Sequence, residues 1–230
     1  IPINAGRDKS IKLIKDANKS SKLIGVVAQR NINDENPGIE NIYGVGTVAK
    51  ILRVLKMPDG NTTVILQGKK RFKIKSIVKT DPYIQATVDP VSDEALKKSN
   101  SKFTATIDAI KDIALKIIKE NPNIPSEASF AIKNIHSSSF LINFVSSNMN
   151  ISVKDKQELL ESTSIQNRAM KSLKFLNLEY EKLALKNDIQ SKVRNDLDQQ
   201  QREYYLQQQM KTIQEELGEN SYHEDIQELI

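Results

Sequence analysis

Glycine and proline are unevenly distributed along the 230-residue chain, and this distribution limits the folds that it can adopt. Seven of the eight glycines and five of the seven prolines lie in residues 1–90, whereas neither occurs from Ser126 to Leu217. These residues mark turns and interrupt helices. The sequence therefore predicts an α+β chain with a turn-rich β region first and long helices after it.

The charge changes at the same point. Residues 1–90 carry a net charge of +8, from 16 Lys and Arg against 8 Asp and Glu, whereas residues 91–230 carry −3. The longest apolar runs, near residues 23–28 and 140–145, are far shorter than the roughly 20 residues that cross a bilayer. Mixed charges at 27% and hydrophobic residues at 38% exclude a low-complexity tail as well as a membrane protein.

The chain has no cysteine and two isolated histidines. It therefore lacks disulfides, thiolate zinc sites and cysteine nucleophiles, and fits a reducing compartment. It begins at Ile1 without an initiator methionine. We expect either a removed leader or a longer parent chain. The expected location is the cytoplasm, and a mitochondrial or other leader is the alternative.

In the first part, one amphipathic helix is expected at residues 7–18, because Ile11, Ile14 and Ala17 recur at helical spacing. Five β-branched or alternating runs predict strands after it. A tight hairpin is expected at Asp59-Gly60, and a long polar loop at residues 31–41. The strands are predicted at residues 23–29, 43–57, 62–67, 71–79 and 83–88, and so many short strands favour a small barrel.

The second part predicts a helical bundle followed by one very long helix. Apolar residues recur at helical spacing from Phe103 to Ile117, and Asn121-Pro122 would end this helix. Ser152 and Asp155 have the spacing of a capping box. Shorter helices are expected at residues 126–135, 138–147 and 152–161. Residues 164–217 contain no breaker and would form roughly 80 Å of helix at about 1.5 Å per residue, which Gly218 would end.

Several motifs resemble the N-terminal region of the Lon family of ATP-dependent proteases, and the resemblance covers essentially the whole chain. Ile1-Pro2-Ile3 looks like the end of the opening strand of that family. The stretches that resemble the family's barrel and long helix are Tyr43 to Lys50, Met57 to Gly60, Leu66 to Phe72, Asn167-Arg168, Leu176 to Glu179, Gln201 to Leu206 and Ile213 to Gly218.

The resemblance implies a small PUA-like β-barrel at residues 1–90 with a truncated first strand, a bundle at 91–163, a coiled-coil helix at 164–217 and a linker from 218. It also implies a parent homohexamer with an AAA+ ATPase domain, which uses ATP and Mg²⁺, and a Ser–Lys protease domain. Such an enzyme would serve protein quality control by degrading misfolded, damaged and short-lived regulatory proteins. Neither the ATPase nor the protease is present here, and no catalytic residue is assigned.

The residues themselves also argue against an enzyme within this chain. Gly68-Lys69 lacks the earlier glycine of a phosphate-binding loop, and His223-Glu224 lacks the second histidine of a zinc helix. Carboxylate pairs such as Asp93-Glu94, Asp196/Asp198 and Glu215-Glu216 are interpreted as solvated groups on helix faces. No cofactor or metal site is therefore expected.

A basic cluster in the β region is the first candidate binding site. Strand alternation would place Lys69, Arg71, Lys73 and Lys75 on one face and Phe72 and Ile74 inward. A solvated strand face is the simpler interpretation. The alternative is phosphate contact with DNA or RNA, which would weaken steeply with salt.

The far end of the long helix is the second candidate. Tyr204, Tyr205, Leu206 and Met210 are bulky, and the two tyrosines point about 100° apart. In one interpretation, one tyrosine packs and the other is exposed without function. In the other, soft exposed side chains contact unfolded polypeptide.

Three hypotheses follow from these features. The first is a client-binding and spacing arm of a Lon-like protease, with unfolded or damaged proteins as partners. The second is a nucleic-acid-binding module, and the third a purely structural coiled-coil spacer. None of them involves a membrane.

Overall fold

The computed structural model describes residues 1–34, 37–57, 62–94 and 101–216. The chain divides into two compact units, Ile1–Glu179 and Tyr180–Ile230, and each is described by itself. The predicted hairpin turn at Asp59-Gly60, Gly218, His223 and the linker from residue 218 lie outside the described residues. The predicted division at residues 90, 163 and 217 stays a prediction.

The first part of the chain forms one five-stranded antiparallel sheet. Its strands are β1 (Pro2–Ala5), β2 (Leu23–Val26), β3 (Val45–Lys56), β4 (Thr62–Lys79) and β5 (Gln85–Val91). The order is β1-β4-β3-β2, and β5 also pairs with β4. β1 pairs with residues 62–65 of β4 and β5 with residues 71–79, so β4 is the strand that joins the sheet together.

β4 corrects one prediction. The polar Gly68-Lys69-Lys70 stretch was expected to separate two strands, but β4 runs through it as one strand of 18 residues. The reason is pairing with β3, which continues along residues 62–73 and shifts register near Lys69. Tertiary pairing therefore overrides the low strand propensity of Gly and Lys here.

α1 (Asp8–Lys19) packs its apolar stripe on the sheet and confirms the predicted helix. Ile14 and Ala17 are its buried residues. A 3-10 helix, η1 (Ile39–Asn41), lies in the expected polar loop. The buried core cluster of this sheet region (residues 1–91) consists of Ala5, Ile14, Ala17, Ala49, Ile51, Val64 and Leu66.

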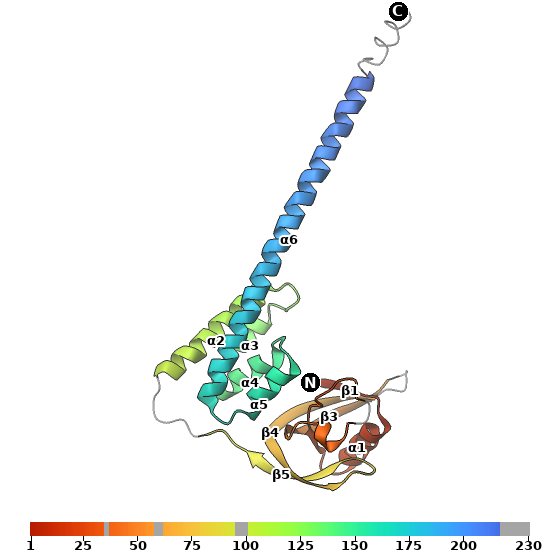
Figure 1. Ribbon diagram of the computed structural model, residues 1–230, viewed down its shortest axis with the longest axis vertical. Coiled ribbons are helices and arrows are strands. Elements are labelled where there is room, and N and C mark those ends of the chain that lie inside the picture. The colour runs from red at the N-terminus through yellow and green to blue at the C-terminus, as the bar shows by residue number, and fades with distance from the viewer. Residues whose placement is uncertain (35–36, 58–61, 95–100, 217–230) are drawn as a thin grey trace, which may run out of the picture. The chain divides into compact units, whose positions relative to one another are not determined.

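The helical region (residues 101–179) has its own core. Its helices are α2 (Ser101–Glu120), α3 (Ala128–Asn134), α4 (Ser138–Asn148), α5 (Val153–Glu161) and the first part of α6 (Ile165–Glu216). In Figure 1, α2–α5 are grouped around the first turns of α6. The most deeply buried apolar side chains are Ile110, Leu141, Ile142, Leu159, Ala169 and Leu176.

Side-chain caps position the short helices. Ser152 caps α5 by accepting a hydrogen bond from the amide of Asp155, and Ser137 caps α4 by accepting from the amide of Phe140. The Ser152 hydroxyl also donates to the Asp155 carboxylate at 2.6 Å. The cap predicted at Ser152 is thus confirmed, and Ser137 adds a second serine cap, whereas α3 has no side-chain cap.

α6 is one continuous helix of 52 residues, as the absence of breakers predicts. All of its buried residues lie between Ile165 and Leu176. The second compact unit, from Tyr180 onward, contains the rest of the helix; Tyr180, Leu183, Ala184 and Asn187 are partly buried, and every residue from Asp188 to Glu216 is exposed.

Candidate functional site

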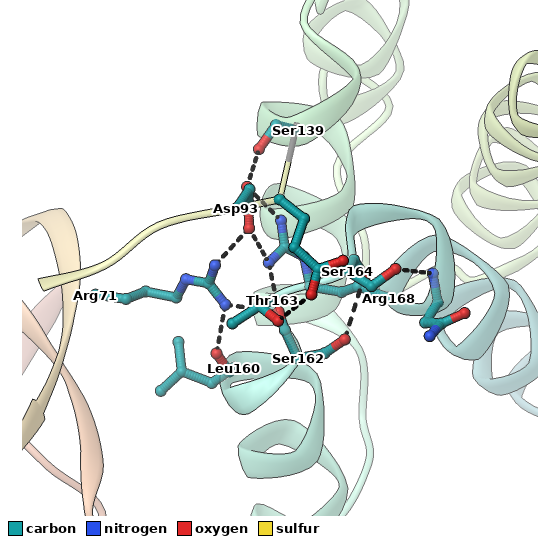
Figure 2. Close-up of polar contacts among 10 residues, drawn as sticks. Arg71, Asp93, Ser139, Leu160, Ser162, Thr163, Ser164 and Arg168 are labelled. Carbon is teal, nitrogen blue, oxygen red and sulfur yellow. Dashed lines mark hydrogen bonds and ion pairs between the residues drawn. The ribbon is translucent and has the colours of Figure 1, made fainter. Parts of the chain in front are cut away.

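A cluster of polar side chains joins the sheet region to the helical region, and its centre is the carboxylate of Asp93. Asp93 follows β5, and its Oδ1 accepts hydrogen bonds from Arg71 of β4 and, at 2.8 Å, from Arg168 of α6. Its Oδ2 accepts from Arg168 at 2.9 Å and from the Ser139 hydroxyl of α4 at 3.2 Å. Figure 2 shows both guanidinium groups converging on this one carboxylate.

The two arginines also bind backbone carbonyls at the end of α5. Arg71 donates from one nitrogen to the carbonyls of Leu160 at 2.7 Å and Ser162 at 2.8 Å. Arg168 donates to the same Ser162 carbonyl at 3.1 Å. These carbonyls lie at a helix C-terminus, where backbone acceptors lack partners within the helix and the dipole favours cations.

Further hydrogen bonds lie beside this cluster. The buried side chain of Gln157 on α5 donates to the Val45 carbonyl of β3 at 2.9 Å. Glu94 and Thr163 exchange two bonds, from the Glu94 amide to the Thr163 carbonyl at 3.0 Å and from the Thr163 hydroxyl to the Glu94 carboxylate at 2.7 Å. The joint between the two regions is therefore held by directional polar contacts from β3, β4, α4, α5 and α6.

The charges at the joint are unequal, with two guanidinium groups around one carboxylate. The Arg168 side chain is 3% exposed, that of Arg71 14% and that of Asp93 29%. Burial disfavours the ionised carboxylate, but hydrogen bonding and the charges of Arg168 and Arg71 outweigh it and lower the pKa of Asp93. Burial and the charge of Arg168 lower the pKa of Arg71. Asp93 is therefore ionised at neutral pH and compensates both cations.

The structure separates the four predicted basic residues. Lys69, Lys73 and Lys75 are exposed, whereas Arg71 is directed into the joint and its guanidinium is engaged. The regular alternation of side chains between the two faces of the strand is also interrupted. Register shifts leave Lys69 without a Cα partner on β3 and Lys75 without one on β5. The nucleic-acid contact stays a prediction, which can now rest on the three lysines alone.

Tyr204, Tyr205, Leu206 and Met210 all lie on the second unit and are all exposed. Tyr204 is 66% exposed and Tyr205 63%, so both tyrosines are open to solvent although they point in different directions. They continue a series of exposed apolar side chains on the same helix. The other members from Leu185 onward are Leu185, Ile189, Val193, Leu197 and Ile213.

Small-molecule chemistry has little support among the described residues. A depression of about 440 Å³ is lined by residues 189–201 of α6 alone, so one face of a single exposed helix forms its whole wall. A second, of about 180 Å³ between the first turns of α2 and α6, lined by Lys102, Thr106 and Met170 among others, is smaller than typical ligand pockets of about 300–1,000 Å³. In the described ranges no three His, Cys, Asp or Glu residues are grouped to hold a metal. Nor does any helix described there have the length and apolarity that crossing a membrane requires.

The sequence did not reveal Asp93 and Arg168 as partners. Asp93 was interpreted as a solvated carboxylate on a helix face, which is wrong: it lies in a connecting segment and binds two arginines. The residues are 75 positions apart, and no local pattern links them. The resemblance drew attention to Asn167-Arg168, but it gave no role for the arginine.

Comparisons with known proteins agree with this architecture. Residues 1–178 match the family model described as the ATP-dependent protease La (LON) substrate-binding domain. The whole chain is 63% identical over 229 residues to the Lon protease of Flavobacterium johnsoniae, and 46% identical to that of Cytophaga hutchinsonii. It spans 28% of the length of each of these relatives.

A solved structure shares the fold. The N-terminal domain of Mycobacterium avium complex Lon protease superposes with a TM-score of 0.60 at 17% identity, over 77% of this chain and 89% of that one. The α+β class predicted from the sequence, with a β region followed by helices and one long helix, is thus confirmed; the β region is the antiparallel sheet described above. Because the family model covers both the sheet and the helices that meet at Asp93, the chain belongs to the family of Lon substrate-binding domains.

Proposed function

We propose that this chain is the client-recognising and spacing region of an ATP-dependent serine protease that degrades misfolded, damaged and short-lived regulatory proteins. The observation that carries the proposal is the series of nine exposed large apolar side chains on α6 from Leu185 to Ile213. Exposed apolar side chains that gather along one segment mark an interaction surface, whereas singly scattered ones do not. The family match supports the same assignment.

Such a surface suits many unrelated clients. Tyrosine combines an apolar ring with a polar tip, and methionine adapts its shape to irregular surfaces. Contacts of this kind are individually weak, so recognition would depend on several copies acting together. In the longer parent protein, a cytoplasmic hexamer would supply six such arms, and ATP and Mg²⁺ would act in its other domains.

The test is binding of a permanently unfolded apolar protein to the chain, fused to a hexameric carrier to restore multivalency. Replacing Tyr204, Tyr205 and Met210 together by Ala should weaken binding at least tenfold. Replacing Gln207, Gln208 and Gln209 by Ala is the matched control, because it changes the same part of the helix and removes no apolar surface. This control should bind as the unchanged chain does.

Two results would overturn the proposal. Absence of client binding by the hexameric fusion would remove the recognition role and leave a spacer. Equal binding by the Tyr204, Tyr205 and Met210 variant and the unchanged chain would show that clients do not use this part of α6. Circular dichroism of each variant confirms that the helix is retained.

Nucleic-acid binding is the second candidate, because Lys69, Lys73 and Lys75 are exposed on the strongly basic sheet region. Affinity for a DNA duplex would then fall by orders of magnitude between low and physiological salt. Charge reversal of these three lysines to Glu should abolish it. The matched control reverses Lys12, Lys15 and Lys19 on α1, which changes the net charge equally at another exposed site.

A further inference from the structure

The core cluster of the sheet region contains no residue of the helical region. The core cluster of the sheet region draws its buried members from β1, α1, β3 and β4. The helical region has its own fully buried set, which includes Ile110, Leu141 and Ile142. Separate cores allow two regions to remain folded when the contacts between them change.

The joint between them is of a different chemical kind. Gln157 and Arg168 are two of the five buried polar or charged side chains in the described residues, and both bind across or beside the joint. Arg71 reaches the carbonyls of Leu160 and Ser162 from β4. Polar contacts of this kind require defined geometry. When the two regions separate, water can take the place of each lost hydrogen-bond partner.

Asp93 is the group on which the arrangement depends. Its carboxylate accepts from both arginines at once, so it is bound to β4 on one side and to α6 and α4 on the other. If the carboxylate loses its charge, two guanidinium groups that share the Ser162 carbonyl are left without an anion. Like charges held close together in a poorly hydrated site repel each other, and separation of the two regions relieves this repulsion.

We propose that Arg71, Asp93 and Arg168 form a latch that locks the sheet region to the start of α6 and opens as a unit while both regions stay folded. The closed latch makes the two regions move as one body. The open latch leaves the sheet region tethered by the segment after β5. The state of the latch therefore decides whether a force on the sheet region is passed to α6.

The latch can be tested in the full 230-residue chain with Asp93→Asn, which keeps the shape of the side chain and removes its charge. The first measurement is hydrogen exchange of the Glu94 amide, which donates to the Thr163 carbonyl across the joint. We expect exchange to become at least tenfold faster, while amides of the β3–β4 ladder and of α4 keep their protection. The second measurement is ¹⁵N relaxation, in which the two regions should acquire different rotational correlation times.

Glu158→Gln is the matched control. It also removes one negative charge, from an exposed pair with Lys171 at 3.3 Å within the helical region. It should leave Glu94 exchange and the common tumbling unchanged. Arg71→Lys is a second latch variant, because it keeps the positive charge but loses the planar fork that reaches two carbonyls and a carboxylate together. It should open the latch even if Asp93→Asn does not fold.

Three results would overturn the proposal. One is unchanged Glu94 exchange and common tumbling in both latch variants, which would show that the cluster does not lock the joint. Another is equal acceleration of exchange throughout the sheet and the helices, which would show that the cluster supports the whole fold. The third is an equal response in Glu158→Gln, which would show an effect of net charge alone.

Discussion

The two ends of α6 are built from the same kind of helix but lie in opposite environments. From Ile165 to Leu176 the helix buries Ala169, Ser172 and Leu176 against the helical region. From Leu185 to Ile213 its large apolar side chains are exposed. Helix formation in the second part therefore follows from good helix formers without breakers, whereas position in the first part follows from packing. An apolar stripe on a helix predicts burial only where the same chain supplies a partner.

The largest expected difference in stability is between two Leu→Ala variants of the same helix. Leu176 is 2% exposed and Leu197 56%. Leu176→Ala should destabilise the chain by about 2–5 kcal/mol, because it leaves a cavity. Leu197→Ala has the same effect on helix propensity and should change the free energy of unfolding by no more than about 0.5 kcal/mol. Urea unfolding followed by circular dichroism measures both, and equal losses would contradict the contrast between the two ends.

The next largest effect concerns the charge that binds the start of α6. Asp93→Asn should lower the free energy that keeps the joint closed by about 1–3 kcal/mol, as measured by hydrogen exchange of the Glu94 amide; the cost is less than for a fully buried pair because Asp93 is partly exposed. The folded-state pKa of Asp93 is lowered, so its stabilisation is complete above about pH 4–5 and is lost as the pH falls through the folded-state value. The difference between the two proteins should therefore shrink on acidification. A difference that grew towards low pH would refute the role given to Asp93.

A smaller effect is expected from the cap that begins α5, next to the joint. Ser152→Ala removes the acceptor of the Asp155 amide and should cost about 1 kcal/mol. Ser191→Ala, in the exposed part of α6, is the control and should be neutral or slightly stabilising because Ala favours helix. Thermal unfolding compares them. A larger loss at Ser191 would show that the exposed part of α6 has hidden packing.

The smallest effect should come from an ion pair on the exposed part of the helix. Lys192 and Asp188 are 2.9 Å apart at i,i+4 spacing, and both side chains are largely exposed. Asp188→Asn should change stability by no more than about 0.5 kcal/mol, and less in high salt. A change of several times that size would place these residues in an environment unlike the one described.

The features predicted correctly from the sequence are those set by local chemistry. The absence of breakers predicted α6 to within about a residue at each end, and Ser152 predicted the start of α5. The helix at residues 7–18 was predicted because Ile11, Ile14 and Ala17 keep helical spacing within a lysine-rich stretch. These patterns depend on neighbouring residues, so they can be identified from one sequence.

The features that the sequence did not predict are set by distant residues. β4 continues through Gly68-Lys69 because β3 lies beside it, and Arg71 leaves the basic strand face because Asp93 and the carbonyls after α5 attract it. The exposed positions of Tyr204 and Met210 were foreseen as one of two alternatives. Their role stays a prediction, because burial in a partner cannot be read from the isolated chain.

Site-specific photo-crosslinking tests most directly the claim that the exposed part of α6 receives clients. A benzophenone amino acid would replace Gln208, between the two tyrosines and Met210, or Lys174, an exposed position in the packed part of the helix. With the hexameric fusion and an unfolded client, crosslinks should form at position 208 and be absent or far weaker at position 174. Equal crosslinking at both positions, or none at position 208 despite client binding, would contradict the account.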